Sequence, residues 1–180
     1  IIITASHNPR EWNALKLLNS KGEFINAEDG KNLMSIADSN PSIDENINLG
    51  SVTFDDSYID THIDSILQLP FIDSESIKRR KFKVVVDAVN STGGIAIPKL
   101  LERLGVETVK LYCDPTGEFP HNPEPLKENL SDLSNLVVSQ AADLGIVVDP
   151  DVDRLAFVSE DGEVFGEVYT LVACADYYLK

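Results

Sequence analysis

The stretch GIVVDPDVDR, residues 145–154, joins an apolar run directly to a strongly polar one. Its first part, Gly145 to Val148, has the continuous apolar character of a strand that is buried on both faces of a sheet. Its second part places three aspartates and one arginine where that strand ends. Open α/β sheets bind ligands at the carboxyl ends of their strands. The stretch therefore predicts both an α/β fold and a ligand site at this edge of its sheet.

The sequence on either side supports that fold class. FKVVVD, residues 82–87, predicts a second buried strand, and the turn at 90–94 leads into a helix that ends at Gly105. Apolar periodicity and turn residues predict a strand over 106–113, a helix from Ser131, a hairpin over 155–165 and a helix over about 168–179. We therefore expect an α/β fold with mixed sheets and crossover helices.

Two consecutive α/β domains are expected, over residues 1–70 and 71–180. The segment 71–81 ends in the basic run KRRK and is interpreted as a solvated linker that enters the next strand. The chain opens on three isoleucines, which predict a strand that starts without the neighbours a sheet needs. We therefore expect the first domain to be incomplete and preceding sequence to have been removed.

The carboxylates of DPDVDR predict a metal site. Asp149, Asp151 and Asp153 alternate, so in an extended segment they point to the same side. Three like charges at such short distances repel one another unless a cation neutralises them. Oxygen-only ligands suit Mg²⁺, and Arg154 beside them offers a planar fork for a phosphate group.

Four other interpretations of DPDVDR stay open on the residues alone. An EF-hand loop matches the acidic spacing with Glu160 at its end, but it requires glycine where this chain has Arg154. A phosphatase of the haloacid-dehalogenase type places Asp-x-Asp after an apolar strand and would use Asp149 as nucleophile. A noncatalytic divalent-ion module and a solvated acidic turn are the third and fourth.

The second polar stretch that follows an apolar run is TASHNP, residues 4–9, directly after the opening isoleucines. Ser6 is a potential nucleophile and His7 a potential acid or base. A turn in which the serine or Asn8 bonds the local backbone is the alternative. A histidine next in sequence is not thereby a triad base, and the G-x-S-x-G elbow is absent.

The composition limits the classes of molecule that this protein is expected to bind. The 180 residues carry 30 acidic and 15 basic side chains, for a formal net charge of −15, which repels nucleic acid and anionic membrane. A polyanionic ligand therefore needs a local basic site or a bridging cation. No apolar run approaches the length of a membrane span, and no basic start with an apolar core marks a signal peptide in these residues. The two cysteines lack metal-ligand spacing and indicate reduced thiols in a cytoplasmic protein.

Taken together, the motifs resemble those of the α-D-phosphohexomutase superfamily, which comprises phosphoglucomutases, phosphomannomutases and phosphoglucosamine mutases. The resemblance rests on ITASHNP followed by Asn13 and Lys16, then FPHNPEP at 119–125, then DPDVDR. These motifs occur in the family's order and extend over essentially the whole chain. The resemblance implies that residues 1–70 are the C-terminal part of the family's first domain and that residues 71–180 are its second domain.

The resemblance also implies roles for individual residues. Ser6 would be phosphorylated in the resting enzyme and serve as phosphoryl donor and acceptor. The implied catalytic residues are Ser6, His7, Lys16 and Arg154, and the implied magnesium ligands are Ser6, Asp149, Asp151 and Asp153. Lys16 or His7 would manage the proton of the reacting hydroxyl, and we expect neighbouring cations to lower the pKa of Lys16. One Mg²⁺ and a hexose 1,6-bisphosphate intermediate complete the implied site.

The implied reaction interconverts a hexose 1-phosphate and a hexose 6-phosphate. The family has four domains, and this chain lacks the sugar-specificity loop of the G-E-x-S-G kind and the later phosphate-clamping loop. We therefore expect the isolated chain to turn over poorly, with a sugar phosphate as partner and neither nucleic acid nor membrane. The residues leave the hexose and the oligomeric state open.

Overall fold

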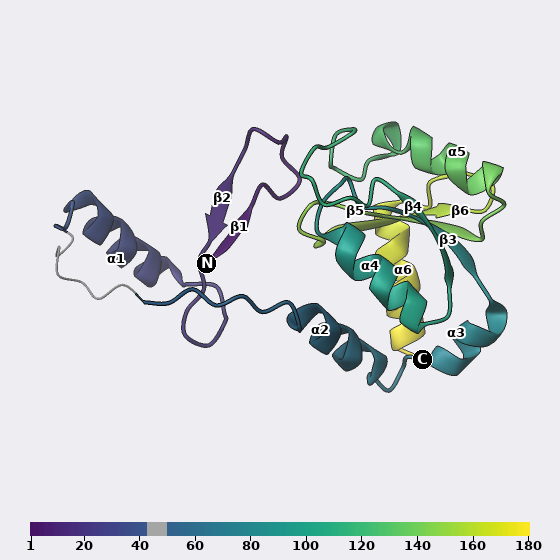
Figure 1. Cartoon of the computed structure of the whole chain (residues 1–180), viewed down its shortest axis with the longest axis horizontal. Coiled ribbons are helices and arrows are strands. Elements are labelled where there is room, and N and C mark those ends of the chain that lie inside the picture. Colours follow the sequence, from purple (N-terminus) through teal and green to yellow (C-terminus); the bar gives the residue numbers. More distant parts are fainter. Residues whose placement is uncertain (43–49) are drawn as a thin grey trace.

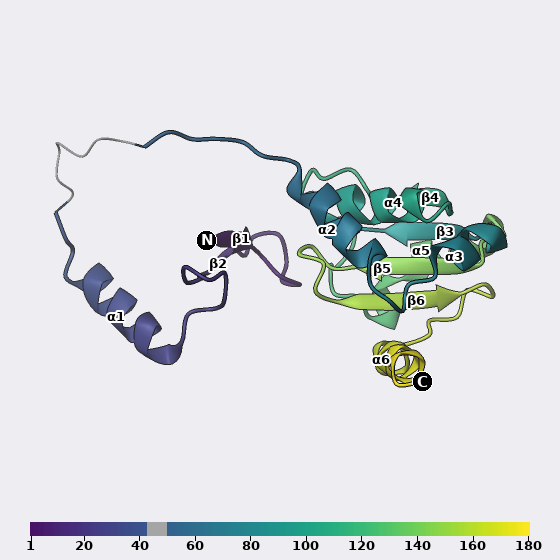
Figure 2. The same ribbon diagram turned by 90° about the horizontal axis from the view of Figure 1, so that it is seen from below.

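A four-stranded sheet forms the centre of the C-terminal part of the chain. The computed structural model describes residues 1–42 and 50–180. The sheet contains β3 (Lys83–Asp87), β4 (Glu107–Leu111), β5 (Leu144–Val148) and β6 (Leu155–Ser159), in the order β4-β3-β5-β6. The pairs β3–β4 and β3–β5 are parallel, whereas β5–β6 is antiparallel. The mixed α/β sheet expected from the sequence is confirmed, and Figure 2 shows its strands side by side.

Helices cover both faces of this sheet because alternate strand residues point to opposite sides. On one face, Val84 and Val86 pack with Leu101 of α4 (Gly93–Arg103). On the other face, buried side chains of the strands pack against α5 (Ser131–Ser139), and the short helix η1 (Lys127–Asn129) precedes α5. The last helix, α6 (Glu167–Tyr178), lies beside β6 (Figure 1). Both faces are apolar, so only the loops at the strand ends can carry polar chemistry.

The segment 71–81 is exposed at its basic end, as expected of a solvated linker, but it also contains a helix that the sequence did not predict. It contains α3 (Ser74–Arg80), which begins where the Asp73 carboxylate accepts the backbone N–H of Ser76 at 2.9 Å. Basic residues fill its last turn, where positive charge interacts favourably with the helix dipole. The basic run is therefore the end of a helix, and whether a domain boundary falls here stays a prediction.

The N-terminal part contains a small antiparallel pair, β1 (Ile2–Thr4) and β2 (Ala14–Lys16), and two helices, α1 (Ala27–Asp38) and α2 (Tyr58–Leu67). Among residues 1–42, Thr4 alone is buried. Asp60 and Asp64 of α2 form ion pairs with Lys99 and Arg103 of α4. Over residues 1–42 and 50–180, no helix combines the length and apolar character needed to cross a bilayer.

Gly94, in the first turn of α4, allows that helix to approach the end of β4. A Cβ at this position would lie 2.2 Å from the backbone carbonyl oxygen of Cys113, which cannot move without distorting the sheet. We expect Gly94→Ala to lower the free energy of unfolding by about 3 kcal/mol. The matched control is Gly30→Ala in exposed α1, where nothing lies within 4 Å and helix propensity favours alanine. Urea denaturation of both variants measures the difference, and equal stability of the two would contradict this packing.

Asp87, at the end of β3, is 1% exposed and accepts a hydrogen bond from His121 Nε2 at 2.9 Å. The other ring nitrogen, Nδ1, faces the carbonyl oxygen of Asn122 at 2.8 Å, so both ring nitrogens donate and the ring is positively charged. Burial acts to lower the pKa of His121, but the hydrogen bond and charge of Asp87 outweigh burial and raise it. This pair fixes the Pro-rich loop, residues 119–125, to the core of the sheet.

Removing His121 leaves the buried Asp87 carboxylate without its cation. We expect His121→Ala to lower the free energy of unfolding by about 3 kcal/mol at acidic to neutral pH. Because the folded-state pKa of His121 is raised, its stabilising contribution is complete below the unfolded pKa of about 6.5 and is lost as pH rises through the folded value. Denaturation of wild type and variant at several pH values should show the gap narrowing on the alkaline side. His62→Ala, at an exposed position of α2, should show no such trend.

Candidate functional site

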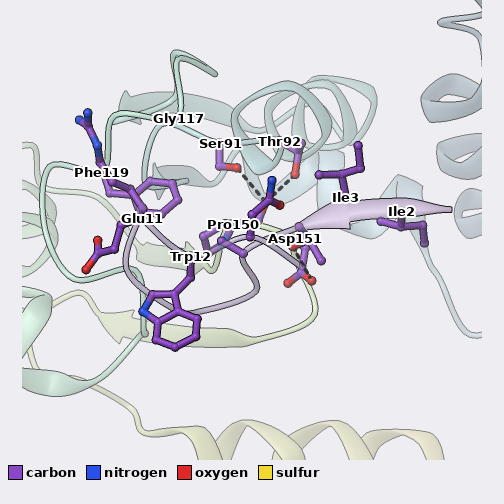
Figure 3. Close-up of a pocket in the computed structure, with 14 residues that line it drawn as sticks. Ile2, Ile3, Glu11, Trp12, Ser91, Thr92, Gly117, Phe119, Pro150 and Asp151 are labelled. Carbon is purple, nitrogen blue, oxygen red and sulfur yellow. Dashed lines mark hydrogen bonds between the residues drawn. The ribbon is translucent and has the colours of Figure 1, made fainter. Parts of the chain in front are cut away.

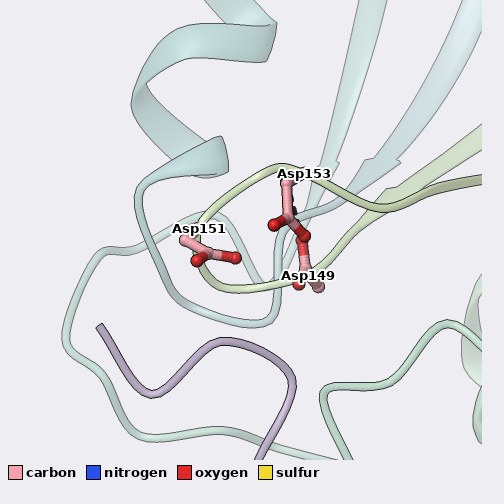
Figure 4. A group of neighbouring side chains, drawn as sticks. All are labelled: Asp149, Asp151 and Asp153. Carbon is pink, nitrogen blue, oxygen red and sulfur yellow. Dashed lines mark hydrogen bonds between the residues drawn. The ribbon is translucent and has the colours of Figure 1, made fainter. Parts of the chain in front are cut away.

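The DPDVDR loop turns sharply after β5 and brings its three aspartates together. The N–H of Val152 donates to the carbonyl oxygen of Asp149 at 3.1 Å, and Val152 adopts φ 64°. Carboxylate oxygens from Asp149, Asp151 and Asp153 lie within 4.8 Å of one another (Figure 4). The predicted convergence is therefore present, but a turn produces it and not the alternation of an extended segment.

Hydroxyl groups from the loop after β3 hold that turn. The side chains of Ser91 and Thr92 both donate to the carbonyl oxygen of Pro150, at 2.8 and 2.7 Å (Figure 3). A left-handed φ is strained for a β-branched residue such as Val152 and persists only where the surroundings impose it. The two hydroxyls and the turn hydrogen bond supply that constraint.

Two carboxylate oxygens of this cluster are buried without a hydrogen-bond partner among the described residues. They are Asp149 Oδ2 and Asp151 Oδ1. Asp149 Oδ1, by contrast, accepts the backbone N–H groups of Asp153 and Arg154 at 3.0 and 3.1 Å. Burial and the charges of Asp151 and Asp153 raise the pKa of Asp149 to about 6. Unpartnered buried carboxylate oxygens that repel one another fit a hard divalent cation, so this group of three can hold a metal ion.

The TASHNP loop lies against this cluster through Thr4. The Thr4 hydroxyl donates to Asp151 Oδ2 at 3.1 Å and accepts the backbone N–H of Ser6 at 2.8 Å. Ser6 has φ 52°, an uncommon conformation for serine, and its Oγ lies 3.2 Å from His7 Nδ1. One hydroxyl group thus connects the serine loop to the acidic loop.

Lys16, on β2, makes the second connection. Its Nζ lies 2.6 Å from Asp151 Oδ2 and 3.5 Å from Asp153 Oδ2. The hydrogen bond to Asp151 is the main cause of a raised pKa for Lys16. This direction is opposite to the expected lowering, because the charges that reach Nζ here are carboxylates and not the cations that such a lowering requires. Burial acts to raise the pKa of Asp151, but hydrogen bonds from Lys16 and Thr4 outweigh it and lower that pKa.

Arg154 links the acidic loop to both neighbouring loops. Its Nη1 donates to Glu124 Oε1 of the Pro-rich loop at 2.7 Å, and its Nη2 lies 3.4 Å from His7 Nε2. On the outer side, Arg10 forms an ion pair with Glu118. All residues assigned from the sequence to the site therefore belong to one connected group.

Sequence reasoning missed several residues that hold the site. Thr4 stands inside the quoted TASHNP motif, and Glu124 stands between two prolines of the Pro-rich loop, yet neither pattern specifies a partner. Their roles depend on contacts across 147 and 30 residues of sequence. Only the tertiary arrangement could reveal them.

A cavity of about 670 Å³ opens between the N-terminal hairpin and the loops of the sheet. Its lining includes Thr4 and Asp151 of the connected group, together with Arg10 and Trp12 (Figure 3). The connected group thus combines a serine, a histidine, two cationic side chains and a carboxylate cluster, which are the residue types that transfer of a phosphoryl group uses.

Two family models match the chain. Residues 60–162 match alpha/beta/alpha domain II of phosphoglucomutase/phosphomannomutase, and residues 1–44 match domain I of the same family. A solved structure described as a phosphoglucomutase/phosphomannomutase family protein from Burkholderia thailandensis is 29% identical, with a TM-score of 0.72. The match covers 98% of this chain and 37% of that one.

Curated relatives agree in family but differ in the sugar they name. A "Probable phosphoglucosamine mutase" from Methanopyrus kandleri is 36% identical over 178 residues, which cover 96% of this chain and 38% of the relative. A phosphoglucomutase/phosphomannomutase from Thermococcus kodakarensis is 35% identical over 181 residues, which cover 99% of this chain and 39% of the relative. The chain thus spans about two fifths of the length of these relatives. With both family models in order and the serine and acidic loops in contact, the chain belongs to the phosphoglucomutase/phosphomannomutase family, that is, to the phosphohexomutases.

Proposed function

We propose that this chain carries the phosphoryl-transfer part of a phosphohexomutase, which interconverts a hexose 1-phosphate and a hexose 6-phosphate through a phosphoserine at Ser6. The observation that supports this most is the contact between the two loops. Thr4 and Lys16 both bond Asp151, at 3.1 and 2.6 Å, and so place the serine loop beside the carboxylate cluster. Phosphoryl transfer depends mainly on such positioning and on neutralised charge.

Magnesium is the cation we propose for the cluster. The ligands would be Asp149, Asp151 and Asp153, with an oxygen of phosphorylated Ser6 as the fourth. The buried, unpartnered oxygens of Asp149 and Asp151 fit this hard cation. When bound, Mg²⁺ would neutralise negative charge on the phosphoryl oxygens.

Side chains of this chain carry out the phosphoryl and proton transfers in two half-reactions. In the first half-reaction, the bond between Ser6 Oγ and phosphorus breaks as a sugar hydroxyl oxygen bonds to phosphorus. Ser6 Oγ takes a proton from His7, and the proton that the sugar hydroxyl loses replaces it on the His7 ring. The product is a hexose 1,6-bisphosphate, which turns over within the site. In the second half-reaction Ser6 Oγ attacks the other phosphoryl group, and the proton movements reverse.

Charge around the transferred group comes from Lys16 and Arg154. The raised pKa of Lys16 keeps its ammonium group protonated in this arrangement, so we propose that it first stabilises the transferring oxygens. Arg154 presents a planar fork beside His7. His7 Nδ1, 3.2 Å from Ser6 Oγ, is placed to exchange a proton with it.

Asp149 is poorly placed for the phosphatase alternative. Its side chain is fully buried, and one carboxylate oxygen already accepts two backbone N–H groups. A nucleophile must be reachable by the phosphorus atom, whereas Ser6 lies in a partly exposed loop.

The test incubates the chain with a hexose 1,6-bisphosphate and Mg²⁺ and measures its intact mass. We expect one phosphoryl group, stable to acid and hydroxylamine, as a serine ester should be. A hydroxylamine-labile group on Asp149, with release of inorganic phosphate, would instead establish the phosphatase. Metal binding without phosphoryl transfer, even in a protein of the relatives' full length, would leave only a divalent-ion module.

We further propose that sugar recognition requires sequence beyond these 180 residues. The chain corresponds to about two fifths of its relatives' length and carries the serine and acidic loops. It should accept a phosphoryl group in single turnover but isomerise hexose phosphates poorly. The identity of the hexose would then be set outside this chain.

A further inference from the structure

The Pro-rich loop delivers a fixed carboxylate to the site. Glu124 stands between Pro123 and Pro125, whose rings restrict the local backbone. Its N–H donates to Asn122 Oδ1 at 3.1 Å, and its carbonyl oxygen accepts from Asn129 Nδ2 at 2.8 Å. The backbone of this residue is thus held on both sides, so its side chain starts from a defined position. Little conformational entropy remains to be lost when that side chain binds a partner.

That partner is the guanidinium of Arg154. Glu124 Oε1 accepts from Arg154 Nη1 at 2.7 Å, and the two side chains are 31% and 33% exposed. Partial burial separates this pair from the open surface pairs of the chain, such as Lys127–Glu163, in which both side chains are more than 70% exposed. A charge-assisted bond to a planar fork also fixes the direction of the other N–H groups.

The second arm of the fork faces His7. Arg154 Nη2 lies 3.4 Å from His7 Nε2, and a guanidinium can only donate. His7 Nε2 is therefore the acceptor, which places the proton of the neutral ring on Nδ1. That nitrogen lies 3.2 Å from Ser6 Oγ. The hydrogen bond made by one ring nitrogen determines the protonation of the other.

We propose that Glu124 is a positioning residue: it orients Arg154, and Arg154 in turn holds His7 in the tautomer that presents Nδ1–H to Ser6. The tautomer follows from the geometry alone, whereas its use in catalysis rests on the proposed function. In that function, the Nδ1 proton is available to Ser6 Oγ when the oxygen–phosphorus bond breaks. The Pro-rich loop thereby acts on a serine that it does not touch.

The first test reads the tautomer directly. The chain is labelled with ¹⁵N, and its imidazole nitrogens are recorded by NMR at alkaline pH, with His7 assigned through His7→Asn. We expect a protonated Nδ1 in wild type. In Glu124→Ala we expect about half of the molecules or more to shift to the Nε2–H form, with a smaller shift in Glu124→Gln, which keeps an acceptor oxygen.

Glu163→Gln is the matched control. It removes a glutamate from the exposed ion pair with Lys127, whose atoms lie 3.2 Å apart and outside the connected group of residues. It should leave the tautomer of His7 unchanged. Backbone amide spectra check that each variant is folded. If Glu124→Ala does not fold, the tautomer of His7 in Glu124→Gln tests the proposal. A wild-type ring protonated on Nε2, or an unchanged tautomer in both Glu124 variants, overturns the proposal.

The second test measures mutase kinetics in a protein of the relatives' full length. A positioning role predicts that Glu124→Ala lowers kcat by about 10-fold, through both the lost tautomer and the misoriented Arg154, and that Glu124→Gln lowers it less, while KM and the affinity for Mg²⁺ stay within about 2-fold. An unchanged kcat would also overturn the proposal. If wild type shows no mutase activity, the proposed function fails, and the NMR result still decides whether Glu124 sets the tautomer.

Discussion

Ser6→Ala is expected to abolish both covalent phosphorylation of the chain and mutase activity in a protein of full family length. In the proposed cycle Ser6 Oγ is the protein oxygen that bonds phosphorus, and no neighbouring side chain is assigned that role. We expect kcat to fall by about 10³-fold or more. Intact mass after incubation with a hexose 1,6-bisphosphate should show no added phosphoryl group, and coupled assays of hexose 6-phosphate formation measure the rate.

Ser20→Ala is the matched control for that experiment. Ser20 lies in the exposed turn after β2 and outside the connected group of residues, so its replacement should leave phosphorylation intact. The metal site should also persist in Ser6→Ala, because Asp149, Asp151 and Asp153 are unchanged. Retention of covalent phosphate in Ser6→Ala would refute the assignment of the phosphoserine.

Asp149→Asn should strongly weaken divalent-ion binding. Asparagine keeps an oxygen that can accept the backbone N–H groups of Asp153 and Arg154, but it removes the negative charge. We expect the dissociation constant for Mg²⁺ or Mn²⁺ to rise by about 10²-fold or more, with a parallel loss of phosphoryl transfer. Calorimetric titration measures the affinity, and Asp161→Asn, in the exposed turn after β6, is the control.

The same substitution should make the metal-free protein more stable at neutral pH. The pKa of Asp149 is about 6 in the folded chain against an ordinary value of 3.8, so the folded state holds this proton more tightly. Stability contributed by the protonated form is complete below the unfolded pKa and is lost as pH rises from about 4 to 6. Above this window Asp149→Asn should exceed wild type by about 2 kcal/mol in a chelator. A less stable variant under those conditions would contradict the burial and repulsion inferred for Asp149.

Periodicity and turn chemistry were enough to predict the strands and helices of the central sheet. Continuous apolar runs such as those of β3 and β5 suit no environment other than a covered sheet. The helix at 74–80 was missed because its seven residues show little apolar periodicity and its basic end resembles a linker. Its stabilising features are local: the Asp73 cap and the basic residues of its last turn. KRRK is exposed, as expected, but it belongs to this helix.

The candidate site was predictable in its residue types and not in its connections. Spacing and chemistry singled out Ser6 and the three aspartates, since alternating acids after a buried strand are hard to explain without a cation. The direction of the Lys16 pKa shift could not be predicted, because it depends on which charges reach Nζ across the fold. Likewise, Thr4 and Glu124 gain their roles only when loops distant in sequence meet, and no local pattern encodes such a meeting.

The left-handed conformation of Val152 has a consequence for anyone who evolves this protein in the laboratory. Selection for heat resistance alone would favour glycine at this position, because glycine adopts φ 64° without the steric penalty that valine meets. It would also favour loss of the charge at Asp149. Such a campaign would deliver more heat-resistant proteins that lack the charge proposed to bind the cation, so each round of selection also needs a screen for activity.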